Sequence, residues 1–314
     1  MFRREFLTRL AGSAASAAMG SSATAFARVR KHHAAPSPPP KLDRIALSSW
    51  SLHNYFRSTR ESTCNLPGQM LVLLDLPEMV YDRFQIRHFD LCASHFPSTE
   101  QAYLHELKYM LTHTQSNVVN LSVDIDACGP EGTFSDPDRE ARLAALDLVR
   151  PWVDVAHALG AKSVSVGPGK FDHEFPARTA ESYKAVANYA LSRGVRVMVE
   201  NQTGFGDERP ADVTKLINLV GPGHLGSLPN FSNFADDPTR AKGLKEFFAL
   251  AQTVCHASGW EARSEESGKG YNFCEAVGIA KQSGFRGFYS IEFDGPGDPY
   301  AGIQKTIDEL LECV

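Results

Sequence analysis

Hydrophobic and polar positions follow a repeating pattern from Asp43 to the end of the chain. Each cycle begins with a short, nearly continuous apolar run, which is typical of a strand covered on both faces. A segment with apolar residues every three or four positions follows and predicts an amphipathic helix. The clearest helices stop before a glycine, which accommodates the left-handed cap of a helix end. Four helices are expected in this way, at Asp138–Leu159, Arg178–Arg193, Ala211–Val220 and Tyr271–Ser283.

Eight apolar runs fit the strand part of the pattern. They are Arg44–Trp50, Ile86–Cys92, Val118–Asp124, Ala161–Val166, Val195–Glu200, His224–Pro229, Thr253–His256 and Gly287–Phe293. Eight strands alternating with helices in a chain of this length predict an α/β fold of the (β/α)8 TIM barrel type. A doubly wound open sheet is the alternative. That fold predicts a glycine-rich phosphate-binding turn after the first strand, and the segment Leu47–Ser51 is not one.

The first 41 residues differ in composition from the rest. Arg3 and Arg4 precede a mildly apolar stretch rich in Ala, Gly and Ser, and Ala25-Phe26-Ala27 offers a cleavage site. Residues 1–27 are therefore expected to be a twin-arginine export signal that sends the protein to the periplasm. Because the stretch also contains many Ser residues, we expect no stable membrane insertion. Residues 28–41 predict a Pro-rich linker, and residues 42–314 the barrel.

Composition and charge narrow the classes of function. The chain is 43% hydrophobic and 22% charged, which is an ordinary globular composition. The formal net charge is −5 and the body has no Lys/Arg-rich run, so we expect no nucleic-acid partner. Six cysteines without CxxC spacing exclude zinc ribbons, and Cys92 and Cys255, inside apolar runs, are expected to be buried. The oligomeric state stays open.

Polar side chains end the last four predicted strands. These residues are Glu200, Asn230, His256 and Glu292. The carboxyl ends of barrel strands meet at one rim, where the active sites of such barrels lie. Two carboxylates, an imidazole and an amide oxygen predict a site for one divalent ion. Burying two neighbouring carboxylates is energetically unfavourable unless they share a cation or a proton, which favours an ion site. The alternative interpretation is that these residues form a packed polar rim without an ion.

At these residues the chain resembles the sugar phosphate isomerase/epimerase superfamily, the xylose isomerase-like barrels, over about residues 42–314. The resemblance implies one Mn²⁺, Mg²⁺, Co²⁺ or Zn²⁺ held by Glu, Asp, His and Glu at the ends of strands five to eight. Glu200, His256 and Glu292 match three of these positions. Asn230 stands where the family usually has Asp, and Asn233 stands where it often has His.

The resemblance implies an isomerase or epimerase that acts on a keto sugar or a related polyol. The metal ion would polarise the carbonyl group, and Glu200 and Glu292 would remove and return the proton on a neighbouring carbon. His95, Asn233 and Arg263 are the expected substrate contacts, although His95 and Arg263 could equally be packed residues of the rim. Asp124, at the end of the third predicted strand, is a further candidate of the same kind.

Other functions stay open at this point. The first is a non-catalytic or weakly metal-binding sugar-binding barrel, which the amide at position 230 favours. The second is a keto-sugar or inosose dehydratase that uses the same site. The third is an endonuclease-IV-like phosphodiesterase, which needs a multi-zinc cage and a basic groove, so the acidic net charge weighs against it.

Overall fold

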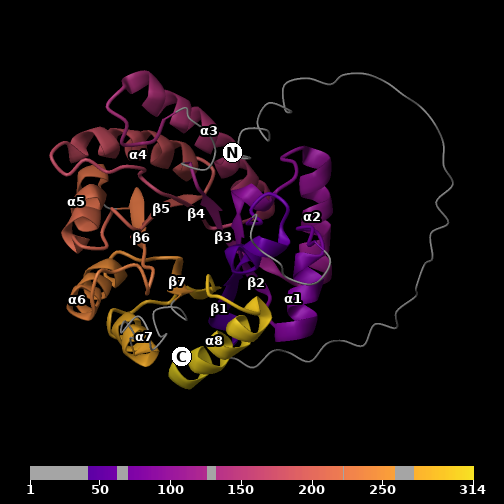
Figure 1. The fold of residues 1–314 in the computed structure, drawn as a ribbon. Coiled ribbons are helices and arrows are strands. Elements are labelled where there is room, and N and C mark those ends of the chain that lie inside the picture. Colours follow the sequence, from indigo (N-terminus) through magenta and orange to yellow (C-terminus); the bar gives the residue numbers. More distant parts are fainter. Residues whose placement is uncertain (1–41, 62–69, 126–131, 222, 259–271) are drawn as a thin grey trace, which may run out of the picture.

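The computed structural model describes residues 42–61, 70–125, 132–221, 223–258 and 272–314. Eight parallel strands in this part of the chain form one sheet in the order β6-β5-β4-β3-β2-β1-β8-β7. Figure 1 shows helices α1 to α8 arranged in a ring around the strands. The predicted (β/α)8 barrel is therefore confirmed. The expected signal and linker, residues 1–41, lie outside the described residues.

The eight strands occur where the apolar runs predict them, with ends that differ by up to two residues. The strands are β1 (Ile45–Ser48), β2 (His88–Cys92), β3 (Asn117–Val123), β4 (Ser163–Val166), β5 (Arg196–Glu200), β6 (Leu225–Leu228), β7 (Val254–Ser258) and β8 (Phe288–Glu292). Strand β1 ends two residues before the predicted end at Trp50, because the chain continues as a 3-10 helix, Ser49–Tyr55. The Ser48 side chain caps that helix by accepting a hydrogen bond from the Trp50 backbone N–H.

Helices follow every strand, and the four expected ones are present. The helices are α1 (Leu76–Phe84), α2 (Gln101–His113), α3 (Arg139–Leu159), α4 (Pro176–Leu191), α5 (Pro210–Val220), α6 (Asp237–Phe248), α7 (Phe273–Gln282) and α8 (Pro299–Cys313). Helix α3 ends at Gly160 in the left-handed conformation, as its sequence predicts. No helix in the described part of the chain is long and apolar enough to span a bilayer.

The barrel closes between β6 and β7 through bonds that lie next to the candidate site. The His256 N–H donates to the Pro229 carbonyl at 2.9 Å, and the Phe231 N–H donates to the His256 carbonyl at 3.1 Å. Together these bonds bridge Asn230 and His256 as a parallel pair. The seam of the barrel therefore fixes the backbone of two of the four predicted ligands.

A small apolar cluster is separate from the main core between the sheet and the helices. It consists of Ala46, Val119, Met198, Leu228 and Val254. Alternate residues of a strand face the same side. Three members of the cluster each lie two residues before a predicted ligand in the sequence: Met198 before Glu200, Leu228 before Asn230, and Val254 before His256. The apolar cluster thus forms a floor beneath the predicted site.

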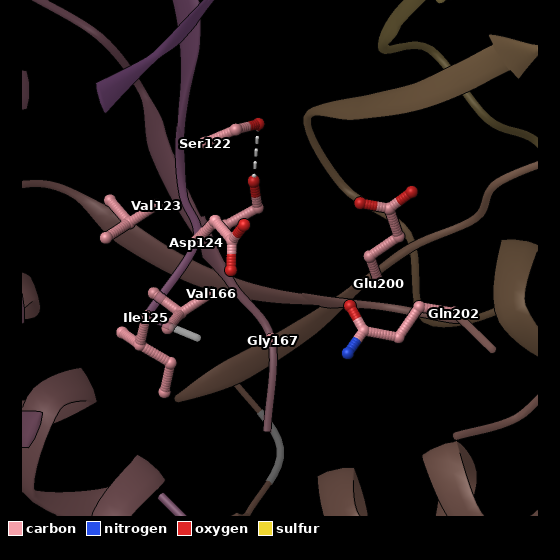
Figure 2. Close-up of a pocket in the computed structure, with 9 residues that line it drawn as sticks. Ser122, Val123, Asp124, Ile125, Val166, Gly167, Glu200 and Gln202 are labelled. Atoms are coloured by element: carbon pink, nitrogen blue, oxygen red, sulfur yellow. Dashed lines mark hydrogen bonds between the residues drawn. The ribbon is translucent and has the colours of Figure 1, made fainter. Parts of the chain in front are cut away.

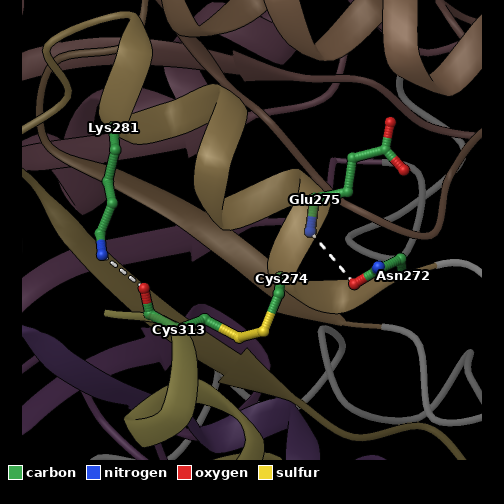
Figure 3. Close-up of a disulfide and its surroundings, with 5 residues drawn as sticks. All are labelled: Asn272, Cys274, Glu275, Lys281 and Cys313. Carbon is green, nitrogen blue, oxygen red and sulfur yellow. Dashed lines mark hydrogen bonds between the residues drawn. A yellow bond between two sulfur atoms is a disulfide. The ribbon is translucent and has the colours of Figure 1, made fainter.

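A disulfide joins Cys274 in the first turn of α7 to Cys313 at the end of α8 (Figure 3). The Lys281 ammonium group donates a hydrogen bond to the Cys313 carbonyl, so two contacts hold the end of α8 against α7. The spacing of the cysteines along the chain does not predict this pair. Cys92 and Cys255 are buried free thiols, as expected from their apolar neighbours.

Candidate functional site

Three of the predicted ligands converge at the carboxyl ends of their strands. Glu200 ends β5, His256 lies within β7 and Glu292 ends β8. Each offers one ligand atom, and these atoms all lie within 4.8 Å of one another. The imidazole side chain is almost completely buried, whereas the glutamates keep about a fifth of their side-chain surface exposed. Two carboxylates and an imidazole in this arrangement fit a divalent ion.

His256 lies at the centre of the group. Its Nδ1 is 2.9 Å from Glu200 Oε1 and 3.3 Å from Glu292 Oε2, and its Nε2 is 2.9 Å from Asp90 Oδ2. Burial alone would lower the pKa of His256, but the two glutamates and the bond to Asp90 outweigh it and raise that pKa well above its usual value. A cation that binds at Nδ1 must therefore displace a firmly held proton.

Asp90, on β2, belongs to the site although it was not among the predicted residues. It is completely buried, and its second oxygen, Oδ1, accepts hydrogen bonds from Asn120 Nδ2 at 2.9 Å and Ser122 Oγ at 3.1 Å. A signal was present in the sequence, because Asp90 is an acidic residue inside the apolar run Ile86–Cys92. An unpaired carboxylate there would be very unfavourable, so an acid in such a run indicates a partner.

Asn230 reaches the site, but not with the atom that was expected. Its Nδ2 donates to Glu200 Oε1 at 2.7 Å and to Glu292 Oε2 at 2.9 Å. Its Oδ1 accepts from the Ser232 backbone N–H at 3.0 Å and from the Ser258 hydroxyl. Because a backbone N–H can only donate, the atom that faces it must be the oxygen. In the structure Asn230 therefore bridges the two glutamates with its amide N–H group, and its role as an amide-oxygen ligand stays a prediction.

The predicted substrate contact Asn233 lies in the segment after β6. Its Nδ2 donates to the Asn201 carbonyl at 3.0 Å, and Asn201 Nδ2 donates to the Asn233 carbonyl at 2.8 Å. Asn201 Oδ1 also accepts from the Asn230 N–H at 2.8 Å. The side chain of Asn233 thus helps to hold the backbone that carries Asn230, and its contact with a substrate stays a prediction. Arg263 lies outside the described residues.

His95 is packed behind the rim of the barrel. The ring is 4% exposed and stacks on Phe56 with centroids 3.9 Å apart. Its Nδ1 is 2.9 Å from Ser49 Oγ, and its Nε2 is 3.1 Å from Thr59 Oγ1. Burial lowers the pKa of His95 to about 3, which keeps the ring neutral. Since hydroxyl groups occupy both ring nitrogens, this geometry favours packing over the predicted contact with substrate.

A pocket of about 100 Å³ opens beside Glu200 at the carboxyl ends of β3, β4 and β5 (Figure 2). It is lined by Ser122, Val123, Asp124, Ile125, Ser165, Val166, Gly167, Glu200 and Gln202. The carboxylates of Asp124 and Glu200 lie on opposite sides of this space, with the Gln202 amide below Glu200. Hydroxyl, carboxylate and amide groups around one pocket suit a ligand rich in hydroxyl groups.

The profile of one protein family matches this chain over residues 78–313, and its description is xylose isomerase-like TIM barrel. A comparison with curated protein sequences found no match.

Several solved structures share the fold at low sequence identity. D-psicose 3-epimerase from Clostridium cellulolyticum H10, solved with D-tagatose, is 13% identical with a TM-score of 0.67, covering 86% of this chain and 99% of its own. A xylose isomerase-like TIM barrel protein from Mycobacterium smegmatis, in complex with magnesium, is 13% identical with a TM-score of 0.62, covering 86% and 97%. A probable 3-DHS dehydratase from Bacillus anthracis is 11% identical with a TM-score of 0.61, covering 84% and 98%. At these identities the likeness shows the fold alone.

The buried neutral His95 should make the protein sensitive to acid. Between its ordinary pKa of 6.5 and the folded value of about 3, the unfolded chain binds a proton that the folded chain does not. The free energy of unfolding therefore falls as the pH is lowered through this range, by up to about 1.4 kcal/mol per pH unit. Urea unfolding at pH 7, 5.5 and 4.5 should show this loss in wild type but not in His95→Gln. Substituting the exposed His105 by Gln should preserve the loss, and an equal acid response in all three proteins would contradict the assignment.

Proposed function

Because the chain belongs to the xylose isomerase-like TIM barrel family, we propose that it is a sugar isomerase or epimerase. Its substrate would be a keto sugar or a related polyol, and the reaction would move a proton on the carbon next to the carbonyl group. The observation that carries the proposal is the convergence of Glu200 and Glu292 on His256 at the carboxyl end of the barrel. The presence of sugar epimerases among proteins of the same fold supports it.

Glu200, His256 and Glu292 would hold one divalent ion, Mn²⁺, Mg²⁺, Co²⁺ or Zn²⁺. Their oxygen and nitrogen donors suit such ions, and a protein of the same fold is described in complex with magnesium. When bound, the ion would polarise the substrate carbonyl and stabilise the negative charge that develops on its oxygen. Asn230 is not one of the ligands in this arrangement, since its N–H groups face the two glutamates.

The two glutamates carry the proton transfer in this proposal. Both accept a hydrogen bond from Asn230 Nδ2, which fixes the distance between the two carboxylates and keeps them facing one space. One carboxylate removes the proton and the other returns it, to the opposite face for epimerisation or to the neighbouring carbon for isomerisation. Positioned acid–base groups of this kind typically contribute ~10²–10⁴-fold to a rate.

The pocket beside Glu200 supports a neutral substrate. Its charged lining groups in the described part of the chain are Asp124 and Glu200, both acidic. Like charges at short range repel, so this wall disfavours a phosphate group and accepts sugar hydroxyls as hydrogen-bond donors. We therefore propose an unphosphorylated sugar or polyol as the ligand of this pocket.

Two further functions have specific support. A probable dehydratase shares the fold, and a dehydratase could use the same acid–base pair. A non-catalytic sugar-binding barrel is favoured by the amide at position 230, because its N–H groups occupy both catalytic carboxylates. The products formed in heavy water separate these functions from the proposed one.

Incubation with Mn²⁺ and a panel of ketoses and inososes in D₂O tests the proposed reaction, read by NMR. Deuterium at the carbon next to the carbonyl is expected, with inversion there for an epimerase or transfer to the neighbouring carbon for an isomerase. Loss of water indicates a dehydratase, and no exchange with any substrate supports the binding barrel. Glu200→Gln and Glu292→Gln should each lose at least ~10²-fold of the exchange, whereas Glu312→Gln, an exposed control, should keep it.

Calorimetric titration of Mn²⁺ tests the ion site independently of any substrate. Asn230→Asp exchanges an N–H donor for a carboxylate oxygen beside Glu200 and Glu292, and a cation relieves the resulting repulsion. We expect the variant to bind Mn²⁺ at least ~10-fold more tightly than wild type, and Glu292→Gln to lose nearly all binding. Asn233→Asp, which adds the same charge nearby, should have a much smaller effect. Equal Mn²⁺ binding by wild type, Asn230→Asp and Glu292→Gln would contradict the ion site.

We also propose that the twin-arginine segment, residues 1–27, exports the protein to the periplasm. The Cys274–Cys313 disulfide supports an oxidising compartment. Replacing Arg3 and Arg4 by Lys should leave the precursor in the cytoplasm with both thiols reduced, as seen by fractionation and mass spectrometry. Normal amounts of oxidised periplasmic protein would contradict the proposal.

The disulfide, which closes a loop of 39 residues, should also stabilise the exported protein. Relative to the variant with both Cys274→Ser and Cys313→Ser, we expect it to add about 4 kcal/mol to the free energy of unfolding.

A further inference from the structure

A buried carboxylate lies on the far side of the imidazole from the two glutamates, and the reaction proposed above gives it no role. We propose that Asp90 is a positioning residue of this site, which holds the Nε2–H of His256 toward itself and leaves Nδ1 facing Glu200 and Glu292. The inference rests on the proposed function, since it concerns how the same site presents its nitrogen ligand. In the described part of the chain, Asp90 bonds to neither glutamate and is not among the residues that line the pocket, so it acts on the site through His256.

The atoms that meet between Asp90 and His256 fix the direction of their hydrogen bond. Asp90 Oδ2 and His256 Nε2 are 2.9 Å apart, and both side chains are buried. A carboxylate oxygen can only accept, so the hydrogen of this bond is carried by Nε2. Nδ1, which faces the glutamates, is then the ring nitrogen that can give up its proton and offer a lone pair to an ion.

The Asp90 carboxylate cannot turn away from His256. Its other oxygen accepts from Asn120 Nδ2 and from Ser122 Oγ, both on β3. The Asn120 amide is itself held, because its oxygen accepts from Ser163 Oγ on β4 at 2.8 Å. Three neighbouring strands therefore fix the orientation of the carboxylate, and through it the plane of the imidazole ring.

Stabilisation of the fold does not by itself explain a carboxylate at this position. A buried ion pair is a poor way to stabilise a barrel, since a well-packed apolar pair of the same volume is often equally stable or more so. A carboxylate behind a ligating histidine does something that an apolar residue cannot: it fixes the tautomer and raises the basicity of the nitrogen opposite. Asp90 lies behind Nε2 in this way, while Nδ1 faces Glu200 and Glu292, the other two proposed ligands of the ion.

The substitution Asp90→Asn separates positioning from packing. The side-chain oxygen of the variant must still face Asn120 Nδ2 and Ser122 Oγ, so its new amide group faces His256 Nε2. Two N–H groups cannot bond to each other, so Nε2 must become the acceptor and the proton that the ring keeps lies on Nδ1. An Asp-to-Asn change behind a catalytic histidine inverts the tautomer in this way and leaves the geometry intact. The variant should therefore fold, but an ion could bind at Nδ1 only by displacing the last proton of the ring.

NMR of the ring nitrogens tests the assignment directly. In the full-length protein labelled with ¹⁵N-histidine, the Nε2-bound proton of His256 should be present in wild type and absent in Asp90→Asn. The matched control is Ser163→Ala, which removes a hydrogen bond from the same network but leaves the contact between Asp90 and His256. This control should keep the Nε2 proton. An Nε2 proton that persists in Asp90→Asn, or that disappears equally in Ser163→Ala, would overturn the assignment.

Titration with Zn²⁺, which is diamagnetic, supplies the second measurement. We expect Asp90→Asn to bind Zn²⁺ ~10–100-fold more weakly than wild type, and Ser163→Ala to bind within a factor of about three of it. Weakening of equal size in both variants, in parallel with their loss of stability, would overturn a positioning role. A wild type that binds no Zn²⁺ or Mn²⁺ would overturn the ion site of the proposed function, whereas the Nε2 proton still decides the assignment of Asp90.

Discussion

The burial of an imidazole among three carboxylates is the constraint on which the rest of the site depends. Asp90, Glu200 and Glu292 all lie within hydrogen-bond or ion-pair distance of His256, inside a barrel whose floor is apolar. Such a concentration of negative charge is strongly unfavourable in a dry interior unless protons, cations or oriented donors balance it. The donors are present in the described part of the chain: Asn120 and Ser122 bond to Asp90, and Asn230 bonds to both glutamates. The polar interior of the barrel is therefore a requirement of the site and not a defect of the core.

The same residues close the barrel. The seam between β6 and β7 is made by backbone bonds on either side of Asn230 and at His256 itself. Asn201, which follows β5, ties that seam to the neighbouring strand by accepting from the Asn230 N–H and donating to its carbonyl. A change that opens the seam must consequently displace two site residues together. Fold stability and site geometry are coupled at this place more tightly than at the β3–β4 and β7–β8 pairs, whose ladders are continuous.

Strand ends were predictable from the sequence because the rule that governs them is local. An apolar run that stops at Glu200 or Glu292 marks a strand end, and parallel barrel topology brings such ends together. The contacts of Asp90 and Asn230 were not predictable in this way. Asp90 meets His256 across 166 residues through the register of the sheet, and the orientation of the Asn230 amide depends on the Ser232 N–H and the Ser258 hydroxyl. The pairing of Cys274 with Cys313 likewise depends on how α7 and α8 pack, which the positions of the cysteines along the chain do not reveal.

Asn230 shows how much of the chemistry depends on a single atom. Three donors, the backbone N–H and hydroxyl of Ser232 and the hydroxyl of Ser258, surround its oxygen, and they would suit a carboxylate oxygen equally well. The surroundings of Oδ1 therefore do not distinguish an amide from an acid. The other atom does, because an N–H group there forms two favourable hydrogen bonds with the glutamates, while an oxygen would place a third negative charge against them. With the amide, hydrogen bonds from the protein itself stabilise the two glutamates. With an acid, three carboxylates would repel one another unless a cation lay between them, so the residue at position 230 sets how strongly the proposed ion site attracts a cation.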